Sequence, residues 1–288
     1  MRLGMMLLGM IVLLSSSVSV FANNKVIYGN DNRVNVLESN SFLTHLADST
    51  AGMIATKKVV ADPTHAGYFT IKGGTLASRG ICADERFANE ITAASCSGFL
   101  VGEDLLVTAG HCMQYSSQCR DNVWVFGFYA DQNGKVAPIP QENIYRCKEI
   151  ISQELNEESQ LDFALIRLEK KVTNREPLKF RQNGKVSDTT NLVVIGHPTG
   201  LPTKIADGAN IRDNSNEIFF VANLDTFGGN SGSAVLDAET GQVEGILVRG
   251  EEDYITDEAM NCKRPMRCQD NECRGEDVTR ITLVKDLK

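Results

Sequence analysis

The sequence has no cluster of lysine and arginine and, beyond its first residues, no long apolar run. Its 288 residues include 29 Lys and Arg against 37 Asp and Glu, a formal net charge of −8 at pH 7. Because phosphate contacts require clustered basic side chains, this composition argues against nucleic-acid binding. The missing apolar runs argue against a stable membrane anchor in the mature chain.

Histidine is also scarce, and the four present do not form a zinc-peptidase motif. None of them belongs to H-E-x-x-H. A zinc site on Cys262, Cys268 and Cys273 is the alternative, but their spacing is looser than in the usual C-x2-4-C pairs. We therefore expect no metal and no other cofactor.

The first residues have the pattern of a signal peptide. Arg2 precedes an apolar run over 3–14, and a serine-rich stretch ends in Val20-Phe21-Ala22. Small or apolar residues at −3 and −1 predict cleavage after Ala22. The alternative is a membrane anchor or a buried helix, for which the run is short. We expect a secreted or periplasmic protein whose remaining 266 residues (288 minus 22) form one large domain or two closely packed smaller ones.

Eight cysteines in a secreted chain are most simply explained by disulfide bonds. Cys96 precedes Cys112 by sixteen residues, so a bridge between them can tie one hairpin. Cys82 and the three C-terminal cysteines allow three pairings, and the sequence does not choose among them.

Helical periodicity is rare, and strand-like runs recur between Gly, Asn, Asp and Pro. These runs cover 97–101, 105–108, 123–129, 163–168, 191–195, 217–221, 233–236 and 243–248. Many short strands with turn residues between them predict an all-β sandwich or barrel. We expect a charged loop at 152–160, an irregular disulfide-tied segment at 251–277, and a boundary between two halves at 170–179.

Three short segments supply the residue types of a catalytic triad. They are Thr108-Ala109-Gly110-His111-Cys112, Leu161-Asp162-Phe163-Ala164-Leu165 and Phe227-Gly228-Gly229-Asn230-Ser231-Gly232-Ser233. A serine hydroxyl becomes a good nucleophile when an imidazole takes its proton and a carboxylate orients that imidazole. Each residue alone has an ordinary structural explanation, but their joint contexts and order favour catalysis.

The context of each residue suits its role. His111 follows a predicted strand, and Asp162 begins an apolar run where a buried carboxylate needs a partner. Gly228 and Gly229 let the backbone bend, so that the amides of Gly229 and Ser231 can form an oxyanion hole. The α/β-hydrolase motif G-x-S-x-G is excluded by Ser233 and by the chain order His, Asp, Ser.

These blocks resemble the catalytic blocks of chymotrypsin-fold serine peptidases. Asn230, before the serine, makes the chain more similar to the bacterial glutamyl endopeptidase branch than to digestive trypsins. The segment 26–33, V-I-Y-G-N-D-N-R, also resembles the mature N-terminus of that branch. The resemblance extends over about residues 26–250.

The resemblance implies an all-β fold with two six-stranded antiparallel β-barrels and an active site in the cleft between them. Residues 26–172 would hold an N-terminal segment and the first barrel, with His111 and Asp162. Residues 173–288 would hold the second barrel, with Ser231, and the Cys-rich C-terminal segment. The resemblance also implies a Cys96–Cys112 bridge beside the histidine, and we expect Cys119–Cys147 in the first barrel.

Asn230 stands where trypsin-type enzymes have the aspartate that pairs with a newly cut N-terminus. An amide cannot form that ion pair, so activation should differ. We expect residues 23–25 to be a short propeptide and the active chain to begin at Val26.

The S1 pocket is where the sequence motifs disagree. Asp225, six residues before the serine, would lie at its base and attract Arg or Lys at P1. Thr226 matches the glutamyl pattern, but Leu247 stands where that branch has a histidine. Arg249 would lie at the pocket mouth, where it neutralises Asp225, recruits an acidic side chain, or forms a structural ion pair with Asp225.

The sequence therefore predicts a secreted serine endopeptidase that cleaves protein or peptide substrates through an acyl-enzyme, after basic P1 residues. The alternatives are a glutamyl-type endopeptidase with acidic P1 and a catalytically inactive peptidase-fold binding protein. The sequence does not indicate an oligomeric state.

Overall fold

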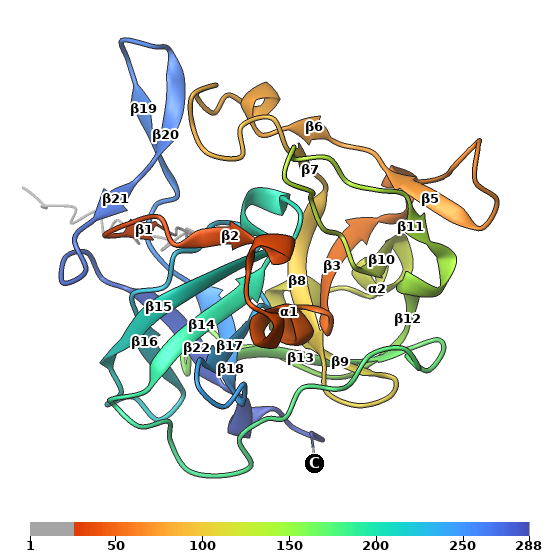
Figure 1. Ribbon diagram of the computed structural model, residues 1–288. Helices are drawn as coiled ribbons and strands as arrows, with labels where there is room; N and C mark the ends of the chain where they lie inside the picture. Colours follow the sequence, from red (N-terminus) through yellow and green to blue (C-terminus); the bar gives the residue numbers. More distant parts are fainter. Residues whose placement is uncertain (1–25, 288) are drawn as a thin grey trace, which may run out of the picture.

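The computed structural model describes residues 26–287, so the predicted signal peptide and propeptide lie outside the described residues. Strands dominate this range, as predicted, and the helices are short (Figure 1). The α-helices are α1 (Ser41–Ala47) and α2 (Ser116–Asp121). The 3-10 turns are η1 (Val36–Glu38), η2 (Thr56–Lys58), η3 (Ala77–Arg79), η4 (Gly110–Met113), η5 (Gln141–Asn143), η6 (Pro198–Gly200) and η7 (Ile281–Leu283). Within the described range, no helix is long and apolar enough to cross a membrane.

The first half of the chain forms a closed antiparallel barrel in the order β10-β12-β13-β9-β8-β3. Its strands are β3 (Thr50–Ala55), β8 (Ala94–Leu100), β9 (Leu105–Thr108), β10 (Asn122–Phe126), β12 (Ile144–Leu155) and β13 (Asp162–Leu168). The apolar run that follows Asp162 is buried from Phe163 to Ile166, which holds the start of β13 inside the molecule.

The second half forms another antiparallel barrel, in the order β14-β17-β18-β22-β16-β15, which closes through pairing of β14 with β15. Its strands are β14 (Asn191–Gly196), β15 (Lys204–Asp213), β16 (Phe219–Ala222), β17 (Ala234–Asp237), β18 (Val243–Arg249) and β22 (Glu276–Arg280). The short β2 (Arg33–Asn35) adds to β15, so the N-terminal segment joins the second barrel's sheet. The predicted fold of two six-stranded barrels is therefore confirmed.

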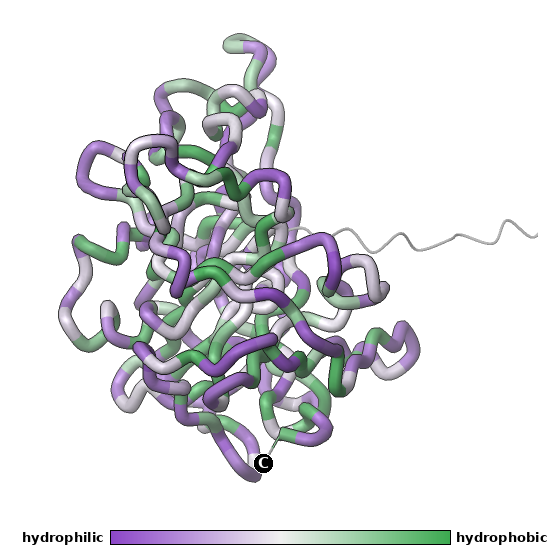
Figure 2. Tube along the Cα trace, turned by 90° about the vertical axis from the view of Figure 1, so that its right-hand side faces the viewer, coloured by the Kyte–Doolittle hydropathy of each residue, from purple (hydrophilic) through white to green (hydrophobic). Residues whose placement is uncertain are grey.

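The two barrels share one hydrophobic core. A single cluster of buried side chains includes Phe99, Trp124 and Phe163 of the first barrel and Ile195 and Ile246 of the second. In Figure 2 the hydrophobic segments lie mainly inside the molecule, and hydrophilic segments prevail in the outer loops. Burial of this shared apolar surface holds the two halves together.

Four small sheets extend from the barrels. They are β4 (Val59–Ala61) with β5 (Tyr68–Ile71) and β11 (Ile139–Pro140), β6 (Gly74–Thr75) with β7 (Ile91–Thr92), β19 (Tyr254–Asp257) with β20 (Cys262–Pro265), and β1 (Ile27–Tyr28) with β21 (Arg267–Cys268). Two predictions were wrong here. Residues 152–155 belong to β12 rather than to a loop, because they pair with β13. The segment 251–277 contains β19, β20 and β21, since its polar residues pair in hairpins and with the N-terminal segment.

All eight cysteines are joined in disulfides. The two expected bridges, Cys96–Cys112 and Cys119–Cys147, are present. The remaining cysteines pair as Cys82–Cys262 and Cys268–Cys273. These pairings exclude the zinc alternative, because disulfide sulfurs are not thiolate ligands.

Candidate active site

His111 lies in η4, a tight turn that directly follows β9. Gly110 is required at this turn, because a Cβ there would overlap the carbonyl oxygen of Glu154. The disulfide from Cys112 to Cys96 ties the turn to β8. The imidazole is thus held on a short, cross-linked segment, with its side chain 20% exposed.

Asp162 lies at the start of β13, buried, with both carboxylate oxygens directed at His111. Oδ1 accepts the backbone N–H of His111 at 3.1 Å, and Oδ2 lies 2.8 Å from Nδ1. Since a carboxylate only accepts, Nδ1 carries the proton in this contact. That tautomer leaves Nε2 with a lone pair able to accept a proton.

Ser231 is brought against the strand ends that carry His111. Its carbonyl oxygen accepts the N–H of Ser97 at 2.8 Å and lies 3.7 Å from Cys112 Sγ. Gly232 N–H donates to Leu247 O on β18 at 2.8 Å, which fixes the other side of the turn. Among residues 26–287, the Ser231 hydroxyl forms no hydrogen bond with the His111 ring. The backbone of the serine is therefore adjacent to the His111 turn, whereas the hydroxyl–imidazole bond is not formed.

The backbone around Gly229 is fixed on both sides. Gly228 O accepts the N–H of Thr199 at 2.6 Å, and Gly229 O accepts the hydroxyl of Ser97 at 2.8 Å. In a trans peptide the C=O and N–H point in opposite directions. Anchoring Gly228 O on Thr199 therefore turns the N–H of Gly229 away from Thr199. A fixed amide of this kind can donate to an oxyanion.

A buried histidine, His197, contacts Ser97, whose hydroxyl donates to Gly229 O. His197 is fully buried, with Nδ1 3.1 Å from Ser97 Oγ and Nε2 3.1 Å from Thr203 Oγ1. Its ring also stacks on Phe128. Burial lowers the pKa of His197 to about 3, so the ring is neutral and structural. Sequence reasoning missed Ser97 and Thr203, because their partners lie far away in the chain.

Asp225 is buried and does not present a free carboxylate. Its Oδ1 accepts the backbone N–H of Tyr28 at 2.7 Å, and its Oδ2 accepts that of Asn32 at 2.9 Å. Burial raises the pKa of Asp225 to about 6. The alternative in which Arg249 pairs with Asp225 is wrong, because Arg249 Nε binds Asp277 Oδ2 at 3.1 Å.

Thr226 is buried next to an acid that sequence reasoning did not single out. Thr226 Oγ1 donates to Glu276 Oε2 at 2.8 Å, and its N–H donates to Val26 O at 3.3 Å. A Cβ at Gly250 would overlap the Glu276 carboxylate, so this carboxylate lies directly against the end of β18. The region predicted as S1 therefore contains Glu276 as well as Asp225.

No metal-ligand set emerges at this site. The one candidate group in the described part of the chain is Cys96, His111 and Cys112. Its two cysteines are joined to each other, so they offer no thiolate.

Comparisons with known proteins agree with the fold. A family model described as a trypsin-like peptidase domain matches residues 96–246, more than half of the chain and a span that contains His111, Asp162 and Ser231. The solved structure of Vibrio cholerae VesB protease is similar, with a TM-score of 0.51 and 13% identity, over 90% of this chain and 65% of that one. The chain thus spans slightly less than two thirds of the VesB protease chain. A Glu endopeptidase in complex with MPD gives a TM-score of 0.48 and 18% identity, over 84% and 94% of the two chains. No curated protein matches the chain.

Proposed function

Because the chain belongs to the trypsin-like peptidase domain family, we propose that it is a serine endopeptidase that hydrolyses polypeptides through His111, Asp162 and Ser231. The observation that carries this proposal is the pair of contacts from Asp162 to His111, one to the backbone and one to Nδ1. These contacts hold the ring in the tautomer that a general base requires.

The reaction proceeds through an acyl-enzyme. Ser231 Oγ attacks the peptide carbonyl while His111 Nε2 takes its proton, and Asp162 stabilises the imidazolium. The amides of Gly229 and Ser231 hold the oxyanion of the tetrahedral intermediate. His111 then gives the proton to the leaving amine, and water hydrolyses the ester by the same route. Catalytic hydrogen bonds often form only in the substrate complex, so we expect the His111 Nε2–Ser231 Oγ bond to form when substrate binds.

The Ser231→Ala variant tests this function. It should lose peptide hydrolysis while keeping the far-ultraviolet circular dichroism and melting temperature of the parent. Ser233→Ala is the matched control, because it removes a neighbouring hydroxyl that no step uses. Near-parental turnover by Ser231→Ala would show that the mechanism is wrong.

For specificity we propose a basic P1 residue, supported by the buried acid Glu276 beside Thr226 as well as by Asp225, whose oxygens already accept two backbone N–H groups. Asp225 precedes Thr226 in the sequence, and Glu276 accepts a hydrogen bond from Thr226 Oγ1. Arg249 is paired with Asp277. A panel of substrates differing only at P1 tests this proposal. Arg and Lys should be preferred over Gln, and a preference for Glu would favour the glutamyl alternative.

We propose that the active chain begins at Val26. The supporting contacts are those of the first described residues, in which Val26 is buried and Tyr28 and Asn32 bind Asp225. N-terminal sequencing of active protein from culture medium or periplasm should give Val26. Active protein that begins at Asn23 would contradict the proposal.

We also propose that the protein is secreted or periplasmic. Its four disulfides support this location outside the cytoplasm.

A further inference from the structure

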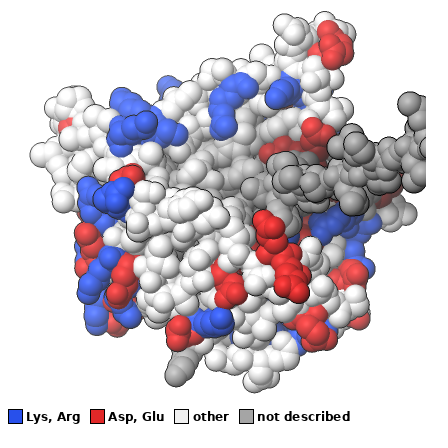
Figure 3. Space-filling model, turned by 180° about the vertical axis from the view of Figure 1, so that it is seen from behind, with Lys and Arg blue, Asp and Glu red and all other residues white. Residues whose placement is uncertain are grey.

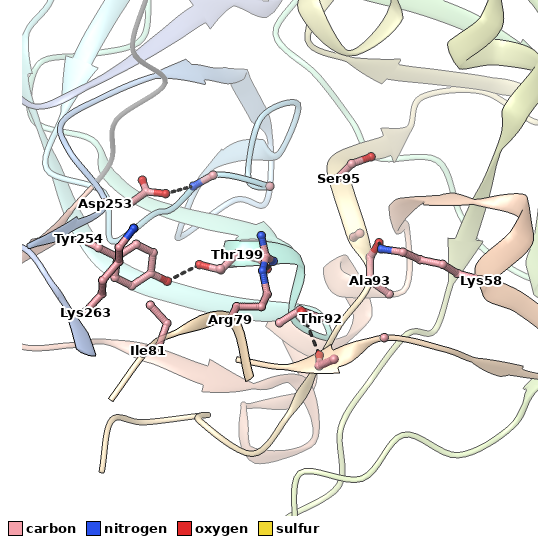
Figure 4. A pocket seen from close by; sticks show the side chains of 15 residues that line it. Lys58, Arg79, Ile81, Thr92, Ala93, Ser95, Thr199, Asp253, Tyr254 and Lys263 are labelled. Atoms are coloured by element: carbon pink, nitrogen blue, oxygen red, sulfur yellow. Dashed lines mark hydrogen bonds between the residues drawn. The ribbon is translucent and has the colours of Figure 1, made fainter. Parts of the chain in front are cut away.

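A cavity of about 770 Å³ opens beside the nucleophile loop (Figure 4). Gly228 and Gly229 form one wall, and 93–95 at the start of β8 form another. The remaining walls come from segments outside the barrels, including η3 and the β19–β20 hairpin. A group bound in this cavity therefore lies next to the amide that we assign to the oxyanion hole.

Three cationic side chains line this cavity, each from a different element. They are Lys58 of η2, Arg79 of η3 and Lys263 of β20. Most other buried or half-buried arginines of the chain are paired with carboxylates, for example Arg181 with Glu244. None of the three cavity cations forms an ion pair within residues 26–287.

The contacts of these cations leave donors available. Lys58 Nζ donates to Ala93 O at 3.0 Å, and Arg79 donates from one terminal nitrogen to Thr199 O at 2.8 Å. A lysine ammonium has three N–H donors and a guanidinium has five, so both retain N–H groups for a ligand. Figure 4 shows the labelled side chains of Lys58, Arg79 and Lys263 around the same hollow.

One acid, Asp253, lines the cavity together with the three cations. Asp253 Oδ2 accepts the N–H of Gly228 at 2.9 Å. Burial, and then the charges of Arg79 and Lys57, lower the pKa of Lys58, so like charges are crowded here. Figure 3, which shows the molecule from behind, has several Lys and Arg side chains along its upper part. In a chain of net charge −8, the cavity is a local positive site suited to an anion.

We propose that this cavity binds a carboxylate side chain, Asp or Glu, of the polypeptide substrate on the leaving-group side of the scissile bond. This inference depends on the proposed function. The predicted S1 residues Thr226 and Arg249 do not line the cavity. We place the P1 side chain at Thr226 and Arg249, and the carbonyl oxygen of the scissile bond at the Gly229 amide. The substrate chain after the scissile bond then passes towards residues 93–95. The guanidinium of Arg79 can bind such a carboxylate in a bidentate manner.

Internally quenched peptides provide the test. They share one sequence up to the scissile bond and carry Glu, Gln or Lys at each of the first positions after it. At one of these positions kcat/KM should be about tenfold higher for Glu than for Gln, and lower still for Lys. The Glu preference should fall as salt is raised, because part of the site is exposed.

Charge variants identify the residues responsible. Arg79→Gln and Lys58→Gln should each reduce the Glu-to-Gln ratio severalfold, and Arg79→Glu should favour Lys at that position. Lys72→Gln is the matched control, since Lys72 is exposed and does not line the cavity. Its ratio should stay within twofold of the parent.

A chromogenic substrate with no residue after the scissile bond separates the two proposals. All charge variants should cleave it at parental rates, which also shows that they are folded. Parental cleavage of this substrate without any Glu preference in the peptide series would overturn the inference and leave the proposed function intact. Failure of the parent to cleave either substrate would overturn both.

Discussion

The Ser97→Ala variant is predicted to lower both stability and turnover, because one hydroxyl supports the loop that carries Gly229. Ser97 Oγ donates to Gly229 O at 2.8 Å and accepts the backbone N–H of His197 at 3.0 Å. Each buried polar group left unsatisfied costs about 1–3 kcal/mol. The hydroxyl also lies 3.1 Å from His197 Nδ1, so its removal takes a partner from three buried groups and should lower the free energy of unfolding by about 3 kcal/mol or more.

The effect on catalysis follows from the position of the Gly229 amide. Removal of a whole oxyanion donor costs about 10²–10³ in kcat. Thr199 still holds Gly228 O in the variant, so we expect a partial loss of about 10- to 100-fold in kcat with little change in KM. Steady-state kinetics on a peptide substrate with the preferred P1 residue, at a temperature well below the melting point, measures this loss.

Ser152→Ala is the control, because Ser152 Oγ forms one exposed hydrogen bond to Lys285 O. It should change the unfolding free energy by less than about 1 kcal/mol and leave kcat unchanged. If Ser97→Ala lost stability in urea denaturation but kept parental kcat, the assigned role of Ser97 in orienting Gly229 would be refuted.

Three further perturbations have expected outcomes. Asp162→Asn should lower kcat by about 10⁴, because a carboxamide cannot accept both His111 N–H groups and favours the wrong tautomer; a loss below tenfold in steady-state assays would contradict this. Glu90→Ala should lower the free energy of unfolding by about 3–5 kcal/mol, because it leaves the buried Lys204 ammonium without the carboxylate at 2.5 Å. Pairing it with Lys204→Met should restore most of that loss, and equal destabilisation of the single and double variants in urea denaturation would argue against the pair. Burial raises the pKa of Asp225 from 3.8 to about 6, so its contribution to stability is present below about pH 4 and is lost as pH rises through 6. The parent-minus-Asp225→Asn difference in unfolding free energy should therefore fall by roughly 3 kcal/mol between about pH 4 and pH 7, and a flat difference would show that burial does not control this carboxyl.

The strands that could be predicted from sequence are those whose residues face apolar surroundings. All eight predicted runs fall on barrel strands, because segments such as 163–166 are buried on both faces. The strands β3, β12 and β15 were not predicted, since they carry charged or glycine residues and are held by pairing with neighbours. β22 was missed because its buried Glu276 and Asp277 bind partners distant in sequence.

The site residues also divide into those that a local motif predicts and those whose contacts are distant in sequence. His111, Asp162 and Ser231 each carry a local motif, and the chain order connects them. The contacts that orient the loop come from Ser97 and Thr199, 132 positions and about 30 positions earlier, and no local pattern marks them. Asp225 was assigned to S1 from its distance to the serine, whereas its partners lie at the N-terminus.

Reaction with a fluorophosphonate probe, followed by intact mass and peptide mapping, tests the central claim most directly. The probe phosphonylates a serine only when a neighbouring base activates it. The account predicts one adduct per chain, on Ser231, formed much more slowly in His111→Ala. A folded parent protein that gains no adduct, or gains it on another residue, would contradict the account and favour an inactive binding protein.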